Sequence, residues 1–167
     1  GNPSNPYDTT RGASLGSSSG SALSVSTNLV MASLGEETRA SCRGPSNHNS
    51  VALILPHKAM LGFDGGAIGA DIYCDRSGIH CRTIVDCAKI LDALKDPDNG
   101  YYDPRDPFTT VPRSSVLSTP YSDHIQKEES LAGLRIGVIR ESMAYDPSSK
   151  SEEPIVTAAD NEIKSIL

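Results

Sequence analysis

The sequence GASLGSSSGSA at residues 12–22 and the sequence EETRASCRGP at residues 36–45 enclose a run of small and apolar residues. This run, from residue 20 to residue 34, predicts a helix buried on all sides, because it offers no polar face to water. Taken alone, the glycine- and serine-rich stretch before it is typical of a flexible turn. It lacks the Gly-Lys-Ser/Thr ending of a phosphate-binding loop and the GxGxxG pattern of a dinucleotide site. We therefore expect two polar turns joined by a buried helix.

Strand and helix patterns alternate along the following residues. Residues 51–55 form an apolar run of strand length, whereas the glycine-rich residues 62–78 indicate a loop. Thr83 is a favourable N-cap for a helix over residues 84–94, and Asp86 three positions later completes a capping pair. The apolar side of this helix would consist of Ile84, Cys87, Ala88, Leu91 and Leu94.

The last third of the chain continues this alternation after a long interruption. Residues 97–130 carry five prolines among polar residues and predict a long surface loop. Residues 134–139 indicate a strand, and residues 153–167 indicate an amphipathic helix. The side chains expected to face inward from that helix are Ile155, Ala159, Ile163, Ile166 and Leu167. Because strands and helices alternate, the predicted fold class is α/β.

The chain is mildly acidic, with 15 basic and 21 acidic side chains and a formal net charge of −6. This balance argues against a nucleic-acid partner, because phosphate neutralisation needs a basic face. No apolar stretch approaches the roughly 18–20 residues of a membrane helix, and the first residues lack signal-peptide features. We therefore expect a cytoplasmic protein without a membrane segment. The sequence starts without methionine and ends inside an apolar periodic run, which favours an internal piece of a longer protein.

The four cysteines, at positions 42, 74, 81 and 87, form no CxxC pair. A chain of this size does not need a disulfide framework. A zinc set of Cys74, His80, Cys81 and Cys87 can be imagined, but its spacing matches no familiar ligand pattern. We therefore predict neither a metal site nor a cofactor. Cys87 falls on the apolar side of the predicted helix, where a buried thiol is the ordinary outcome.

The spacing of two serines gives the strongest functional signal. Ser41 lies 24 positions after Ser17. At this same separation, the amidase signature family has a glycine- and serine-rich stretch of the type Gly-Gly-Ser-Ser-Gly-Gly-Ser and then an Asp-x-Gly-Gly-Ser-x-Arg-x-Pro turn. Residues 15–21 resemble the first and residues 37–45 resemble the second.

Three further stretches resemble the same family in the same order along the chain. Residues 75–88, with the sequence DRSGIHCRTIVDCA, are similar to its Asp-x-x-Gly-Pro-x-x-Arg-Thr-Val-x-Asp-Ala-Ala helix entry. Residues 2–11 are similar to its Asn-Pro-Tyr/Trp-Asp lead-in, and residues 134–141 to its Leu-Arg-Ile-Gly-Val strand. The resemblance covers nearly the whole chain. It implies that residues 1–167 are the central part of one amidase-signature domain, whose mixed β-sheet core is covered by helices and whose N- and C-terminal parts are absent here.

The resemblance also implies an amide hydrolase that works through a Ser-Ser-Lys relay. Ser41 would attack the amide carbonyl and form an acyl-enzyme, since an activated serine is a nucleophile. Ser17 would pass the proton between Ser41 and a neutral lysine, after a cis Gly16–Ser17 peptide bond. The oxyanion hole would be formed by the backbone N–H groups of Thr38, Arg39, Ala40 and Ser41. The residues expected to support this turn are Ser18, Glu37 and Arg43.

Some residues depart from the family pattern. Arg39 and Ala40 stand where the family has two glycines, and Leu15 also replaces a glycine. A side chain is penalised wherever the backbone needs a positive φ, so we expect these residues to distort the oxyanion hole. The family's relay lysine lies far upstream, and the 16 residues before Ser17 contain no lysine. Lys58 aligns with the lysine of a separate Gly-Leu-Lys-Pro stretch and is not expected to replace it.

Two other functions stay open. A catalytically inactive homologue or split subunit, serving as a binding or structural component, would explain the missing lysine and the missing glycines. A small-molecule or carboxylate-binding module at the serine-rich helix N-terminus is the third hypothesis. A Ser-His arrangement is also conceivable, but no motif couples Ser41 to any of the histidines, His48, His57, His80 and His124.

The expected partners follow from the leading interpretation. They are a small-molecule amide substrate, the remainder of the domain or a complementary chain, and a second copy in a homodimer. The acidic balance disfavours the branch of the family that acts on charged tRNA.

Overall fold

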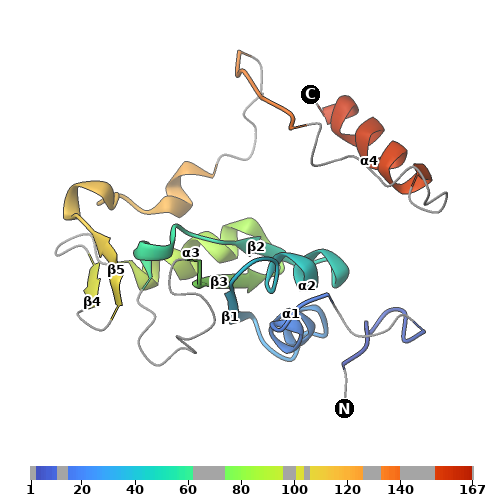
Figure 1. The fold of residues 1–167 in the computed structure, drawn as a ribbon, viewed down its shortest axis with the longest axis horizontal. Helices are drawn as coiled ribbons and strands as arrows, with labels where there is room; N and C mark the ends of the chain where they lie inside the picture. Colours follow the sequence, from blue (N-terminus) through green and yellow to red (C-terminus); the bar gives the residue numbers. More distant parts are fainter. Residues whose placement is uncertain are drawn as a thin grey trace. The chain divides into compact units, whose positions relative to one another are not determined.

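The computed structural model describes residues 3–10, 15–61, 74–95, 101–103, 106–125, 133–139 and 153–166 (Figure 1). The chain divides into two compact units, Gly1–Ile125 and Gln126–Leu167. All the candidate site residues lie in the first unit.

A three-stranded antiparallel sheet forms the centre of the first unit. Its strands are β1 (Ala32–Glu37), β2 (Ala52–Ile54) and β3 (Arg76–Cys81), in the order β1-β3-β2. The middle strand is β3, and its residues from Gly78 to Cys81 are buried. Leu34 of β1 lies opposite Ile79 of β3. The strand predicted at residues 51–55 is confirmed as β2.

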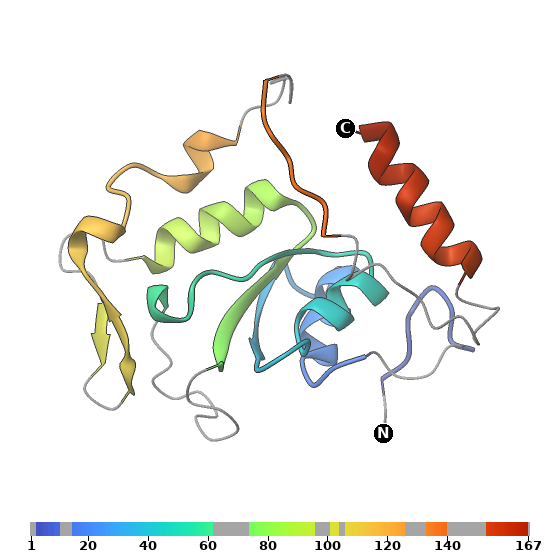
Figure 2. The ribbon, with the colours of Figure 1, turned by 45° about the horizontal axis from the view of Figure 1, so that its top comes forward.

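Helix α3 (Ile84–Leu94) packs against this sheet (Figure 2). Its start is as predicted, because the Thr83 hydroxyl accepts a hydrogen bond from the N–H of Asp86 at 3.1 Å. The core that α3 shares with the sheet consists of Leu61, Ile79, Cys81, Cys87 and Leu91. Full burial of one large apolar side chain contributes roughly 1.5–3 kcal/mol, so this cluster fixes α3 on the sheet. Ile84 and Leu94, at the two ends of the predicted apolar side, are instead exposed.

The helix predicted from residue 20 to residue 34 is shorter than expected. Helix α1 (Ser19–Ser26) ends at Ser26, and Asn28 then adopts a left-handed φ of 60°. The residues from Ala32 onward join β1 instead, because pairing with β3 satisfies their backbone groups. Four apolar side chains that the longer helix would have buried are exposed: Leu29, Val30, Met31 and Leu34.

Two predicted loops contain regular structure. Arg76–Gly78, expected in a loop, belong to β3, while residues 62–73 lie outside the described part. Within the expected surface loop of residues 97–130, two strands form an antiparallel hairpin, because their backbone groups pair despite the nearby prolines. The elements of this region are β4 (Tyr101–Asp103), β5 (Asp106–Val111), η2 (Arg113–Ser115) and η3 (Tyr121–His124). A further short helix, η1 (Lys58–Met60), precedes it in the chain.

The second unit confirms its helix but not the other expectations. Helix α4 (Glu153–Ile166) forms as predicted. Its apolar residues do not face inward, since Ile155 is 70% exposed and Ile166 is 63% exposed, and Leu167 lies outside the described residues. Residues 134–139 do not form the predicted strand, since neither sheet of the described part includes them.

Asp92 of α3 fastens η3 to this helix. Its carboxylate accepts hydrogen bonds from the N–H of Tyr121 at 2.6 Å, from the N–H of Ser122 at 3.0 Å and from the Ser122 hydroxyl at 2.8 Å. The Lys95 ammonium lies 3.1 Å from the same carboxylate. Burial acts to raise the pKa of Asp92, but these hydrogen bonds outweigh it and lower the pKa to about 2.

We expect Asp92→Asn to loosen η3 by roughly 1–3 kcal/mol, because the amide cannot accept the same set of hydrogen bonds. In the unchanged protein, this contribution is fully present above the ordinary pKa of 3.8 and is lost as the pH falls toward about 2. Hydrogen exchange of the Tyr121 and Ser122 amides between pH 2 and pH 7 measures both effects. Equal protection of these amides in the variant and the unchanged protein would contradict the assignment.

Candidate active site

Backbone contacts join the two polar turns. The N–H of Ser18 donates a hydrogen bond to the carbonyl of Ser41 at 3.2 Å. A Cβ added to Gly16 would lie 2.8 Å from the Cα of Ser41 and 2.9 Å from the Cδ of Pro45, so this close approach requires glycine. Ser17 therefore lies between two residues that contact the Ser41 backbone. Ser17 is exposed and Ser41 is half-buried, so neither is sealed in the core.

Side-chain hydroxyls hold the serine-rich stretch in place. The Ser18 hydroxyl donates to the carbonyl of Glu36 at 2.9 Å and accepts from the N–H of Glu36 at 3.0 Å. The Ser19 hydroxyl donates to the carbonyl of Gly16. The start of α1 is thereby tied to β1, and Ser17 sits on a hydrogen-bonded segment rather than in a free loop.

Glu37, at the end of β1, is a fully buried carboxylate. Its Oε2 accepts hydrogen bonds from the N–H groups of Cys42 and Arg43, both at 3.0 Å. Its Oε1 accepts from the side chains of Arg43 at 2.8 Å and Arg76 at 3.2 Å. Burial acts to raise the pKa of Glu37, but these hydrogen bonds outweigh it and the pKa is lowered. The ionised carboxylate therefore closes the turn that carries Ser41.

A second link connects this turn to the start of β3. The Thr38 hydroxyl donates to Oδ1 of Asp75 at 2.6 Å, and Asp75 is 1% exposed. The sequence assigned no role to Asp75 or Arg76, although both lie in the stretch of residues 75–88 that resembled the family. The only local feature of these two residues in the sequence is their charge. The residues that they contact, Thr38 and Glu37, lie 37 and 39 positions away.

The two residues that replace glycines before Ser41 do not adopt the positive φ that would penalise their side chains. Among the described residues other than glycine, only Asn28 and Ser50 have a positive φ. Arg39 and Ala40 therefore lie in an ordinary backbone region, where a side chain carries no penalty. Leu15 is 71% exposed, so its side chain projects into solvent.

His80 of β3 is fully buried beside these turns. Its Nδ1 lies 2.9 Å from the Ser46 hydroxyl, and its Nε2 has no hydrogen-bond partner. A Cβ added to Gly35 would lie 2.7 Å from this Nε2 and 2.8 Å from the Ser18 hydroxyl, so the ring packs closely on β1. Burial lowers the pKa of His80, opposed in part by the charge of Glu37, so the ring is neutral at pH 7. Its hydrogen bond goes to Ser46, which gives no support to a pairing with Ser41.

The four side chains considered as zinc ligands, Cys74, His80, Cys81 and Cys87, do not form a metal-binding group. Cys81 and Cys87 lie in the hydrophobic core, whereas Cys74 is exposed. Within the described ranges, no three His, Cys, Asp or Glu side chains are grouped so as to hold a metal ion. The described helices also include none whose length and apolar character would let it cross a membrane.

Residues 1–161 match the family model described as Amidase. The chain belongs to the amidase family. A probable amidase of Arabidopsis thaliana is 36% identical over 135 residues, which are 81% of this chain and 25% of that protein. A glutamyl-tRNA(Gln) amidotransferase subunit of Prochlorococcus marinus is 33% identical over 165 residues, which are 97% of this chain and 31% of that protein. The chain thus spans about a quarter to a third of the length of these curated relatives.

Solved amidase structures share the fold. An amidase family protein from Bacillus anthracis is 30% identical, with a TM-score of 0.55 over 64% of this chain and 20% of that chain. The native peptide amidase from Stenotrophomonas maltophilia is 30% identical, with a TM-score of 0.54 over 70% of this chain and 22% of that chain. The predicted α/β amidase fold is therefore confirmed, and the described residues form part of it.

One expectation from the amidase resemblance is wrong for this structure. No peptide bond among the described residues is cis, and the Gly16–Ser17 bond is among them. The physical reason is the lower free energy of the trans form, which for residues other than proline is favoured by about 3 kcal/mol.

We expect Gly16→Ala to destabilise this amidase-family protein by about 1–3 kcal/mol, because the new methyl group would meet the backbone of Ser41 and the ring of Pro45. Gly20→Ala is the matched control, since a Cβ at Gly20 meets nothing within 4 Å. Gly20 lies in α1, so its replacement is expected to raise stability by up to about 1 kcal/mol. Urea unfolding of both variants measures the difference, and equal midpoints would show that the two turns do not approach so closely.

Proposed function

We propose that this protein is an amidase-type serine hydrolase that cleaves a carboxamide C–N bond through an acyl-enzyme on Ser41. The observation that supports it most directly is the hydrogen bond from the Ser18 N–H to the Ser41 carbonyl, with the Gly16 contact beside it. These contacts support a relay between the two serines, because they join the segment that carries Ser17 to the backbone of Ser41. Membership of the amidase family supports an amide as the class of substrate.

In the proposed reaction, the Ser41 hydroxyl oxygen attacks the amide carbonyl carbon while its proton passes to Ser17. Ser17 gives its own proton to a neutral lysine, which the amidase resemblance places upstream. The C–N bond then breaks, the amine leaves with a proton returned through the relay, and the acyl group stays on Ser41. Water repeats the attack and releases the carboxylic acid. Residues 1–16 hold no lysine, so we propose that the base comes from a part of the protein outside these 167 residues.

The backbone N–H groups of Thr38, Arg39, Ala40 and Ser41 are proposed to receive the developing oxyanion. Each such donor typically raises the rate of the reaction about 10²–10³-fold. The contacts of Glu37 with Arg43 and Arg76 support this role, because a turn held rigid has less to reorganise when charge develops. The absence of positive φ at Arg39 and Ala40 also supports it, since neither side chain strains the turn.

The partners of the reaction are proposals of the same kind. The substrate is a small-molecule amide, and the rest of the site comes from the remainder of the amidase domain or from a complementary chain. A relative that is named as one subunit of an amidotransferase supports a complementary chain. We also propose a cytoplasmic location and a homodimer. The alternative is a catalytically inactive homologue or split subunit. Its basis is the replacement of two family glycines by Arg39 and Ala40, against which stands the lack of a positive φ at either position.

Labelling with a fluorophosphonate probe tests the proposal on the longest natural chain that contains these residues. An active serine hydrolase forms a covalent adduct on Ser41, which peptide mass spectrometry locates. Heat-denatured protein serves as the control for non-specific reaction. An inactive homologue gives no adduct, and an adduct on another serine removes the assignment to Ser41.

A further inference from the structure

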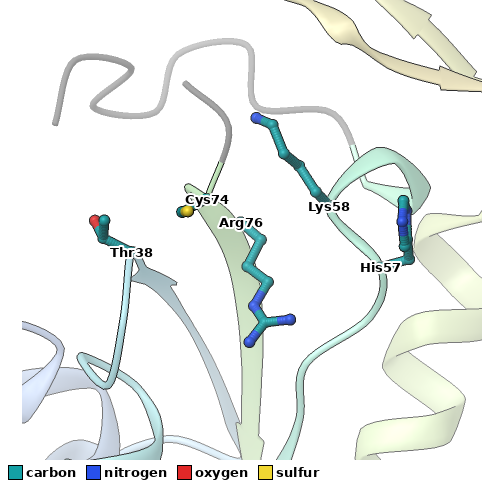
Figure 3. Close-up of a pocket in the computed structure, with 5 residues that line it drawn as sticks. All are labelled: Thr38, His57, Lys58, Cys74 and Arg76. Atoms are coloured by element: carbon teal, nitrogen blue, oxygen red, sulfur yellow. The ribbon is translucent and has the colours of Figure 1, made fainter. Parts of the chain in front are cut away.

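A cavity of about 320 Å³ opens beside the proposed oxyanion turn (Figure 3). Its described lining consists of Thr38, His57, Lys58, Cys74 and Arg76. Two of these residues carry a fixed positive charge, none is acidic and none is aliphatic. Thr38 directly follows β1, Arg76 begins β3 and Lys58 begins η1, so the wall adjoins one end of the sheet.

Hydrogen bonds hold both cations in place. The Lys58 ammonium donates to the backbone carbonyl of Asp75 at 3.1 Å, and the Arg76 guanidinium donates to Glu37 at 3.2 Å. An ammonium and a guanidinium that are already positioned bind an anionic group with little further loss of side-chain freedom. The surface of this lining is more polar than apolar, which suits a polar ligand better than a hydrocarbon chain.

Two buried carboxylates next to the lining residues limit the negative charge of a ligand that the cavity can bind. Glu37 is fully buried and Asp75 is 1% exposed. Both lie next to lining residues, Glu37 through Arg76 and Asp75 through Thr38. Their negative charge offsets part of the field of the two cations, so a monoanion is favoured over a phosphate dianion.

We infer that this cavity binds a carboxylate of the substrate, so that the amide cleaved at Ser41 carries a free carboxylate at its other end. The inference rests on the proposed function, because it places the reacting carbonyl at the turn that Thr38 begins. Lys58 is the specificity-determining residue in this arrangement, with Arg76 beside it.

Cys74 provides a direct readout of occupancy. It is the exposed member of the four cysteines, while Cys42, Cys81 and Cys87 are buried. The rate at which N-ethylmaleimide labels Cys74 therefore reports whether a ligand fills the cavity. The ligands are succinamate, a small amide with one carboxylate, and its neutral methyl ester, both tested on the full-length natural protein with Ser41→Ala to prevent turnover.

Succinamate is expected to slow Cys74 labelling by about 5-fold or more at saturation, and the methyl ester to leave the rate unchanged. Lys58→Met is expected to abolish the protection and Lys58→Arg to restore it. Lys89→Met is the matched control, since Lys89 lies exposed on α3 outside the cavity lining and should keep the protection. Equal protection by the ester, protection by inorganic phosphate but not by succinamate, or loss of protection in the control would overturn the inference.

Steady-state kinetics separates this inference from the proposed function. With Ser41 intact, Lys58→Met is expected to raise KM for succinamate by about 10–100-fold, which corresponds to the loss of one charge-assisted hydrogen bond. The value of kcat should change little. The KM for the methyl ester should not change. If neither amide is hydrolysed and no fluorophosphonate adduct forms, the proposed function fails, while Cys74 protection still decides whether the cavity binds a carboxylate.

Discussion

Replacement of Ser41 by alanine is expected to lower amide hydrolysis by at least about 10⁴-fold and to abolish fluorophosphonate labelling. The reason is that the acyl-enzyme cannot form without the Ser41 hydroxyl, whereas the binding groups remain. The measurement is kcat/KM for a neutral amide, together with the mass of the labelled protein. This is the largest effect that the proposed mechanism requires of any single side chain in the chain.

Ser24→Ala is the matched control for this variant. The Ser24 hydroxyl donates to the carbonyl of Ser21 within α1, and Ser24 belongs to neither serine motif. Its removal should leave kcat/KM within about 2-fold of the unchanged protein, because single helix-surface hydrogen bonds contribute about 1 kcal/mol or less to stability. Persistent labelling in the Ser41 variant would place the nucleophile on another serine and remove the assignment to Ser41.

The second large effect is expected from Glu37→Gln, which we predict to destabilise the protein by about 3–5 kcal/mol and to reduce activity in parallel. The buried carboxylate accepts hydrogen bonds from Cys42, from the backbone and side chain of Arg43, and from Arg76. Glutamine carries no negative charge at this position. Its NH₂ group would also face N–H donors that a carboxylate oxygen of Glu37 now accepts from. The cost comes from the loss of four charge-assisted hydrogen bonds to a buried acceptor, since the side chains of Arg43 and Arg76 are 59% and 33% exposed and stay in contact with water.

The dependence of stability on pH gives a second test of the Glu37 prediction, with a defined direction. The pKa of Glu37 is lowered in the folded state, although burial acts to raise it, because four hydrogen bonds favour the ionised form. Its contribution is therefore present above the ordinary pKa of 4.5 and is lost as the pH falls through the lowered value. In Glu37→Gln this acid-linked loss should disappear. Urea unfolding at intervals between pH 3 and pH 7 measures it.

The neighbouring Glu36 supplies a control with the opposite sign. Burial, and the charge of Asp75 after it, raise the pKa of Glu36, so ionising it costs free energy in the folded state. Glu36→Gln is therefore expected to leave stability at pH 7 unchanged or slightly higher. If both glutamine variants lost stability equally, the specific role of the Glu37 contacts in closing the Ser41 turn would not stand.

Several elements could be predicted from the sequence because they depend on contacts between neighbouring residues. The Thr83 hydroxyl caps α3 through the N–H of Asp86, three residues away, and the helical spacing of Cys87 and Leu91 put both in the core. Each of these contacts depends on residues within a few positions of one another or on a regular repeat. The two serine motifs were found in the same way, from residue types at a characteristic separation.

Two errors in the fold, at β1 and β3, concern contacts between distant segments. Residues 32–34 have the small and apolar character of the preceding helix, yet they form β1 because β3, more than 40 residues later, pairs with their backbone. Backbone pairing leaves no periodic mark on a strand whose side chains are small. The same reason explains β3 itself, whose glycine and serine suggested a loop. Residues 134–139 show the converse, since their apolar pattern alone does not make them a strand of either described sheet.

The sequence by itself determined the family, and through that resemblance it predicted Ser17 and Ser41 as the site residues, because residue order and spacing can be compared without knowledge of any contact. Only the tertiary structure decided how the second turn is held: Glu37 reaches Arg76, Thr38 reaches Asp75, and Lys58 and Arg76 meet at one cavity. Such contacts arise when antiparallel pairing brings the end of β1 beside the start of β3. Charge complementarity between segments some 40 residues apart has no local signature, so it becomes visible only once the sheet has formed.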